Sequence, residues 1–177
     1  MKKVVWKAYM DYEKEEEWLN EMSASGLAMT EYTWCRYVFE DCDPGDYTYR
    51  IELLDNRPDH PESKLYIRFM EENGVEQVAS YIRWVYFRKK AADRPFDIYS
   101  DTDSRIRHYK RILALWLPLC GLDLVVGVSN LLIGLSYSPT NLAMSILLFV
   151  LGGIFLYHCF KVMRKLGRLQ SEKKLRE

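Results

Sequence analysis

Two long apolar runs separated by six residues restrict what this chain can fold into. The first run, 112–135, has 24 residues and one formal charge, Asp123, and the second, 142–160, has 19 residues and none. A helix needs about 20 apolar residues to cross a bilayer core of ~30 Å. The runs therefore predict two membrane spans joined by a tight turn. We expect a transmembrane hairpin over 112–160.

Charge is divided unevenly along the chain. Residues 1–104 carry 14 Lys and Arg against 22 Asp and Glu, a net charge of −8, whereas 105–177 carry 11 against 3, a net charge of +8. The basic residues lie at 105–111 and in the tail 161–177, and the turn between the runs has no charge. Because Lys and Arg gather on the cytoplasmic side of membrane spans, this pattern predicts a multi-pass protein of the plasma membrane with both termini in the cytoplasm.

The basic flanks leave two interpretations open. They set the orientation of the hairpin, or they also bind anionic lipid headgroups, so that membrane lipid is a predicted partner. The acidic balance of residues 1–104 gives no support for a nucleic-acid partner, which would require a basic surface.

Residues 1–104 form a separate cytoplasmic α+β domain by their patterns. Apolar residues at helical spacing predict a helix over 12–25, capped by Asp11 and ended by Gly26, and a second helix from Pro61 to about Asn73. Alternating residues predict the strands, which are 4–8, 28–39, 47–54 and 75–88, the last as one strand or a pair. The order β-α-β-β-α-β predicts a ferredoxin-like sandwich, with one antiparallel sheet and both helices on one face. The strands 28–39 and 47–54 are expected to pair as an antiparallel hairpin.

A juxtamembrane helix over 105–111 is expected to begin near Ser104 and to continue into the first span. Asp101 and Asp103 are both candidates for its N-cap. No Gly/Ser-rich linker separates the domain from the hairpin, so the sequence favours a stiff connection.

Residues that carry chemistry are scattered. The three histidines fall in a loop, in the juxtamembrane helix and in a span, and Cys35 and Cys42 lack a second ligand pair. No nucleophile elbow, phosphate loop or metal-ligand spacing is present. We therefore expect no catalytic, cofactor-binding or metal site, no cofactor, and no enzymatic activity.

Aromatic side chains gather on the predicted strands, and two interpretations stay open for them. They form an exposed face that binds a peptide, a small apolar ligand or a second copy of the domain, or they pack in the core and across strands. The residues proposed for such a face are Trp34, Tyr47, Tyr49, Trp84 and Tyr86.

Asp123 is the one charged residue within the two apolar runs. It lies about 16 Å into the first span, level with Gly152 and Gly153 of the second, and an acid at that depth should face protein. Two glycines allow close approach of the helices. Three interpretations stay open: a polar contact that holds spans or subunits together, an acid that is merely tolerated, and part of a proton or ion pathway.

Several motifs resemble a bacterial family of unknown function. They are the segment 11–22 (DYEKEEEWLNEM) followed by Gly26, the segment 36–40 (RYVFE), the segment 44–50 (PGDYTYR) and the segment 84–89 (WVYFRK). The resemblance implies a soluble domain joined to C-terminal membrane spans, mainly in Gram-positive bacteria and often encoded beside a PadR-like transcription regulator. It implies no activity and no catalytic residue.

The sequence thus favours a non-enzymatic integral membrane protein with a cytoplasmic protein-interaction or regulatory domain. Its expected partner is another protein or a second copy of itself. The alternative is a membrane-anchored sensor that binds a small apolar or cationic ligand on the aromatic sheet face.

Overall fold

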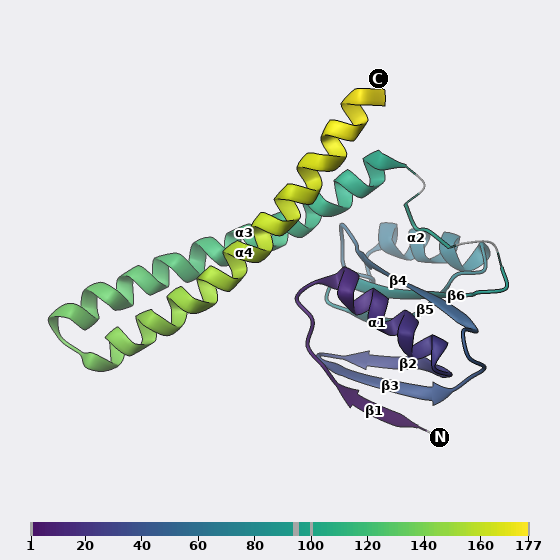
Figure 1. Cartoon of the computed structure of the whole chain (residues 1–177), viewed down its shortest axis with the longest axis horizontal. Coiled ribbons are helices and arrows are strands. Elements are labelled where there is room, and N and C mark those ends of the chain that lie inside the picture. The colour runs from purple at the N-terminus through teal and green to yellow at the C-terminus, as the bar shows by residue number, and fades with distance from the viewer. Residues whose placement is uncertain (1, 94–95, 100, 177) are drawn as a thin grey trace. The chain divides into compact units, whose positions relative to one another are not determined.

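The computed structural model describes residues 2–93, 96–99 and 101–176. The chain divides into two compact units, Met1–Ser100 and Asp101–Glu177. The first unit is α+β, as predicted, and the second consists of two long helices (Figure 1).

The elements of the first unit follow the order β-α-β-β-β-α-β-β. They are β1 (Lys3–Trp6), α1 (Tyr12–Ala24), β2 (Leu27–Thr33), β3 (Arg36–Asp41), β4 (Tyr47–Leu53), α2 (Pro61–Glu72), β5 (Glu76–Tyr81) and β6 (Trp84–Lys90). Local signals placed both helices correctly. The Asp11 carboxylate accepts a hydrogen bond from the Glu13 N–H at 3.3 Å, Gly26 follows α1 at φ +82°, and Pro61 begins α2.

The strands form two antiparallel sheets rather than the single ferredoxin-like sheet expected, so that prediction is wrong. The first sheet has the strand order β1-β3-β2 and the second the order β4-β6-β5. The hairpins are β2–β3 and β5–β6, whereas β3 and β4, expected to pair with each other, belong to different sheets. The two helices likewise do not share one face of one sheet (Figure 1).

The error arose at the turn Trp34–Cys35, which divides the expected strand 28–39 into β2 and β3. Cys35 adopts φ +64° there, a left-handed conformation that two-residue hairpins require and that Gly, Asn or Asp usually supply. Neither residue of this turn is of those types. The matching turn between β5 and β6 places Ile82 at φ +56°, which costs energy for a β-branched side chain.

The first unit is an internal repeat of one β-α-β-β motif. Gly26 and Gly74, both at positive φ after a helix, lie 48 residues apart. The same separation relates the irregularities that follow Met29 in β2 and Gln77 in β5. It also relates the first residues of β3 and β6. Equivalent strands occupy equivalent positions in the two sheets, so the unit is built from two copies of a four-element motif.

Polar side chains of α1 hydrogen-bond along the outer edge of β4. Asn20 accepts from the Tyr49 N–H at 2.7 Å and donates to the Tyr49 carbonyl at 3.2 Å. On either side of it, Glu16 accepts from the Ile51 N–H at 2.9 Å and Ser23 donates to the Tyr47 carbonyl at 2.7 Å. Helical steps of four and three residues rise about 6.0 and 4.5 Å, shorter than the ~6.8 Å of a two-residue strand step but near enough for each side chain to reach its own strand residue. The helix therefore covers a sheet edge that would otherwise be free to pair.

The Glu16 side chain therefore faces β4, whereas its neighbour Glu17 is exposed to solvent. The Glu16 carboxylate lies 3.3 Å from the Arg50 guanidinium, in addition to the bond with Ile51. Desolvation raises the pKa of this carboxyl, while the bonds with Ile51 and Arg50 act in the opposite direction.

The core lies between α1 and both sheets. Buried side chains from α1, β2, β3, β4 and β6 form one cluster, namely Leu19, Met29, Tyr37, Phe39, Tyr49, Ile51 and Tyr86. The Met29 backbone joins the sheets, since its N–H donates to the Tyr49 hydroxyl at 2.8 Å and its carbonyl accepts from Arg88 at 3.1 Å. A second cluster lies between α2 and the opposite face of the second sheet, around Ile67, Val85 and Phe87.

The second unit is a helical hairpin of α3 (Thr102–Ser136) and α4 (Pro139–Arg176). Among the described residues, these two helices are long and apolar enough to cross a membrane. Asp101 caps α3, with its carboxylate accepting from the Ser104 N–H at 2.5 Å. The helix runs without interruption through the first apolar run, and Pro139 begins α4 after a turn of only two residues. The basic tail continues α4 to Arg176.

Candidate functional site

Asp123 faces the partner helix of its own hairpin, opposite Gly152. A Cβ atom added at Gly152 would lie 2.5 Å from Asp123 Oδ2, closer than any real contact, whereas one added at Gly153 would meet nothing within 4 Å. The two glycines that were expected level with Asp123 therefore lie on different sides of α4. Gly152 provides the space in which the carboxylate lies, and Gly153 faces away from the seam. Asp123 Oδ2 is buried and has no hydrogen-bond partner among the described residues.

Small residues recur along the seam between α3 and α4. A Cβ at Gly134 would lie 2.5 Å from the Leu142 nitrogen, and one at Gly127 would lie 3.2 Å from the Phe149 ring. Together with Gly152, these positions let the two helix backbones approach closely. Close approach through small residues is how helices associate in a lipid environment, where burial of apolar surface contributes little.

Three further contacts fix the pairing of the helices. The Cys120 and Cys159 sulfurs, both buried and free, lie 3.6 Å apart. The Trp116 ring lies 5.5 Å from the Phe155 ring. Beyond the apolar runs, Lys173 pairs with Asp103 at 2.8 Å. The pairing of the cysteines was not predicted, because counting from the turn gives the level of each residue but not the side of the helix on which it lies.

The outward sides of the hairpin are apolar. Exposed large side chains lie along both helices, including Leu122, Val125, Leu132, Ile146, Val150 and Ile154. The hairpin thus turns its acid inward and its large apolar side chains outward, the reverse of a helix pair folded in water.

The five aromatic residues expected to share a binding face do not form one exposed surface. Tyr49 and Tyr86 are buried in the core, and Tyr47 and Trp84 are half-buried against it. Trp34, in the β2–β3 turn, is 69 % exposed. The side chains that face away from α1 in the first sheet had not been singled out: Trp6 is 70 % and Val4 46 % exposed. Sequence alternation alone could have separated Trp6 and Val4 from Val5.

Among the described residues of the first unit, no helix covers the outer face of the first sheet (Figure 1). Val4 pairs with Val38 and Trp6 with Arg36, on the face opposite to Tyr37 and the core. In the second repeat both sheet faces are covered, one by α2 and the other by α1 and the first sheet (Figure 1). Val4 and Trp6 are the exposed apolar side chains of this face, whereas Val38 is only 2 % exposed; this side of the first sheet is called the outer face below.

A buried carboxylate joins three elements of the first unit. Glu15 Oε1 accepts hydrogen bonds from the Tyr37 hydroxyl at 2.6 Å and the Tyr86 hydroxyl at 2.7 Å. It thereby links α1 to β3 and β6, one strand from each sheet. Burial raises the pKa of Glu15, although both hydroxyl bonds act in the opposite direction. Burial and the nearby Glu15 charge raise the pKa of both tyrosines. Nothing in the sequence marks Glu15 among its acidic neighbours except its helical phase relative to Leu19.

Within the described residues, no group of three or more His, Cys, Asp and Glu side chains is placed to hold a metal ion. The polar side chains that converge in the first unit bond to one another or to backbone groups, as Glu15, Glu16 and Asn20 do. Their arrangement serves to join helix and sheets.

Comparison with known proteins returns one family. The sequence model of DUF2812, described as a protein of unknown function, matches residues 11–120. The matched range spans most of the α+β unit and the first part of α3. No curated protein and no solved structure matches the chain.

Proposed function

Because this chain belongs to the DUF2812 family, whose function is unknown, we propose a role from its geometry: a non-enzymatic membrane-anchored protein with a protein-interaction domain. In this proposal α3 and α4 span the plasma membrane, the turn at residues 137–138 lies outside the cell, and the α+β unit and the tail lie in the cytoplasm. The observation that carries the proposal is the hairpin, with outward apolar side chains and an inward Asp123.

The charge pattern supports the proposed orientation. The basic residues of 105–111 lie near the start of α3 and those of 161–177 near the end of α4, at the open end of the hairpin. The turn at the other end is uncharged. Transfer of these basic groups across the membrane would be unfavourable, whereas transfer of the turn would not.

Reporter fusions test the anchoring. A fluorescent protein fused after the last residue should fold in the cytoplasm, and alkaline phosphatase inserted between Tyr137 and Ser138 should be active outside. If alkaline phosphatase is active when fused at the C-terminus but inactive when inserted at the turn, the proposed orientation is overturned. Recovery of the full chain in the soluble fraction would overturn the anchoring.

We propose that the outer face of the first sheet is the interaction surface. Trp6 is exposed there, and Trp34 is exposed in the β2–β3 turn, although tryptophan is usually buried in large part. Ion pairs surround the apolar centre, since Lys2 contacts both Glu31 and Glu40 and Arg36 contacts Glu31. A small apolar centre with a charged rim is the usual composition of a protein-binding patch.

Site-specific crosslinking tests this surface. A photoreactive residue in place of Trp6 should give one defined adduct in membranes, and its mass would identify a second copy or another protein. Leu65, which is similarly exposed on α2, provides the matched control and should give none. Equal diffuse labelling from both positions would contradict an interaction surface at the outer face.

The alternative, a sensor for a small apolar or cationic ligand, requires an exposed aromatic face. Tyr49 and Tyr86 lie in the core, which leaves Trp34 as the exposed member of the expected five. The interaction proposal is therefore the one that the geometry supports best.

A further inference from the structure

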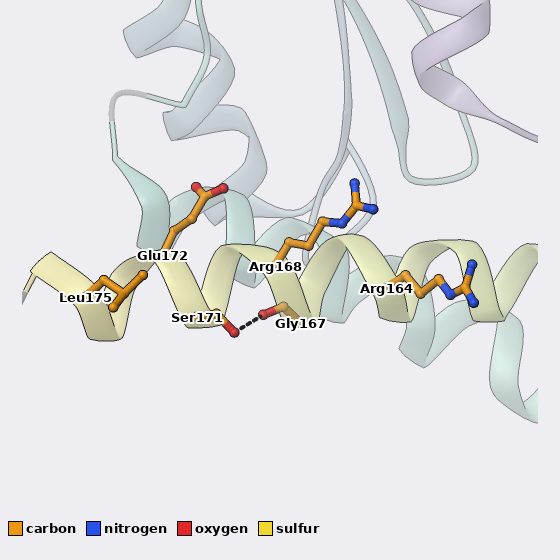
Figure 2. A pocket seen from close by; sticks show the side chains of 6 residues that line it. All are labelled: Arg164, Gly167, Arg168, Ser171, Glu172 and Leu175. Atoms are coloured by element: carbon orange, nitrogen blue, oxygen red, sulfur yellow. Dashed lines mark hydrogen bonds between the residues drawn. The ribbon is translucent and has the colours of Figure 1, made fainter.

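The tail of α4 carries a shallow hollow directly beyond the second apolar run. Its volume is about 620 Å³, and it is lined by Arg164, Gly167, Arg168, Ser171, Glu172 and Leu175 (Figure 2). Gly167 has no neighbour within 4 Å of the position that a Cβ would occupy. Gly167 and Ser171 lie along one edge of the hollow and Arg168 and Glu172 along the other, and the missing side chain of Gly167 leaves the first edge open (Figure 2). The Ser171 hydroxyl donates to the Gly167 carbonyl at 3.0 Å.

The surroundings of the hollow are strongly basic. Between the Trp116–His158 contact and the Asp103–Lys173 ion pair, α3 and α4 run side by side. Residues 104–115 and 159–171 contain no Asp or Glu. The basic residues of these two segments are Arg105, Arg107, Lys110, Arg111, Lys161, Arg164, Lys165 and Arg168.

Arg164 is held at the boundary of the apolar run. Its guanidinium carbon lies 4.3 Å from the centre of the Phe160 ring, and Phe160 is the last residue of that run. A step of four helical residues rises about 6 Å, which places Arg164 within the headgroup region that borders the hydrocarbon core. The ring contact orients the guanidinium while its N–H groups remain free to bind a ligand in the plane of the group.

We propose that the hollow binds the phosphate group of an anionic phospholipid in the cytoplasmic leaflet, with Arg164 and Arg168 as its charged ligands. This inference rests on the proposed membrane anchoring. Arginines four residues apart lie on one side of a helix, and each guanidinium can donate two hydrogen bonds to phosphate oxygens. The bare backbone at Gly167 lets the headgroup approach the helix closely. Glu172 lies at the far end of the hollow and opposes an anion there, which confines the phosphate to the end between the arginines.

Lipid binding by the full chain in detergent micelles tests the proposal. The probes are fluorescently labelled phosphatidylglycerol and phosphatidylcholine, with the anionic lipid expected to bind. Gly167→Leu fills the hollow without changing charge and should weaken phosphatidylglycerol binding by about tenfold, as should Arg168→Gln. Glu172→Gln should strengthen it. Leucine also has the higher helix propensity, so Gly167→Leu does not weaken the helix itself.

Lys174→Gln is the matched control, because it removes one positive charge from the same tail outside the hollow. It should change binding by less than about twofold. Equal losses for Lys174→Gln and Arg168→Gln, with no effect of Gly167→Leu, would overturn the site in favour of diffuse attraction. Displacement of the lipid by free glycerophosphate at equal concentration would show that phosphate alone is recognised and would overturn the lipid assignment. Correct reporter topology together with any of these failures would leave the anchoring intact.

Discussion

The Asp123 carboxylate lies in the space left by the missing side chain of Gly152, on the other helix of the same hairpin. The acid is thereby directed into the contact between the two spans of one chain. Of the interpretations drawn from the sequence, a polar residue between spans is the one that this position favours, and a role between subunits stays a prediction.

A methyl group at position 152 should disrupt the hairpin. Gly152→Ala places a Cβ against Asp123 Oδ2 and should destabilise the helix pair by about 1–3 kcal/mol, as overpacking does. Gly153→Ala is the control, because its methyl meets no atom within 4 Å, and it should be neutral or stabilising by up to about 1 kcal/mol. Unfolding in detergent, followed by helical circular dichroism, measures both.

The same pair gives a double-mutant cycle. Asp123→Ala removes the carboxylate, so the cost of Gly152→Ala should largely disappear in the double variant, with a coupling of about 0.5–3 kcal/mol. Additive effects of the two substitutions would show that the two residues do not meet.

The two buried cysteines should form a disulfide bond on oxidation. Their sulfurs lie 3.6 Å apart and a bond requires about 2.05 Å, so a shift of about 1.5 Å suffices. Oxidation of the full chain in detergent should block alkylation of Cys120 and Cys159 together, as read by peptide mass. Cys120→Ser should restore alkylation of Cys159. A crosslink between Cys159 and Cys35 would contradict the helix register.

Glu15 should make the stability of the first unit depend on pH. Burial raises its pKa above the ordinary value of 4.5, so the folded state binds the proton more tightly than the unfolded state. The free energy of unfolding should therefore fall as the pH rises from about 4.5 through the raised pKa.

Glu15→Gln removes this ionisation and should reduce the slope of the pH profile, with the contribution of Glu16 remaining. The amide oxygen can still accept from both tyrosine hydroxyls. Glu17→Gln, at an exposed position of the same helix, should keep the slope of the natural protein. Chemical denaturation of the full chain in detergent at a series of pH values compares the three proteins. Identical slopes would mean that Glu15 titrates as it does in the unfolded chain.

The contact between α1 and the edge of β4 should depend on Asn20. Asn20→Ala leaves the Tyr49 N–H without its side-chain acceptor, whereas the Tyr49 carbonyl keeps the hydrogen bond from Arg50 at 2.9 Å. The loss should cost about 1–3 kcal/mol. Glu21→Ala, at an exposed position of the same helix, should cost less than about 0.5 kcal/mol. Faster amide hydrogen exchange at Tyr49 in the Asn20 variant would confirm that the loss arises at this edge.

The elements marked by local chemistry were predictable from the sequence. Asp11, Gly26 and Pro61 act on the residues beside them, so both helices were placed within one or two residues. The division into two sheets was not predictable in this way, because the turn at Trp34–Cys35 contains none of the usual turn residues and is imposed by the pairing of β2 with β3. The internal repeat was also hidden, since it preserves strand positions and buried positions more than residue identity.

The candidate site likewise has parts that the sequence predicts and parts that it does not. The level of Asp123 with Gly152 follows from counting residues across a short turn, so the sequence was informative. Which of two adjacent glycines faces the carboxylate depends on the rotation of α4, which counting cannot give. The burial of Tyr49 and Tyr86 follows from the position of α1 between the sheets, a tertiary relation without a local signal.

Cysteine labelling in intact cells tests the central claim most directly. In a chain whose four natural cysteines are replaced by Cys35→Ser, Cys42→Ser, Cys120→Ala and Cys159→Ala, single cysteines are placed at the turn by Tyr137→Cys and in the tail by Gln170→Cys. A membrane-impermeant maleimide should label the Tyr137→Cys protein before lysis and the Gln170→Cys protein only after lysis. Labelling of Gln170→Cys in intact cells, with protection of Tyr137→Cys, would contradict a hairpin that holds the α+β unit in the cytoplasm.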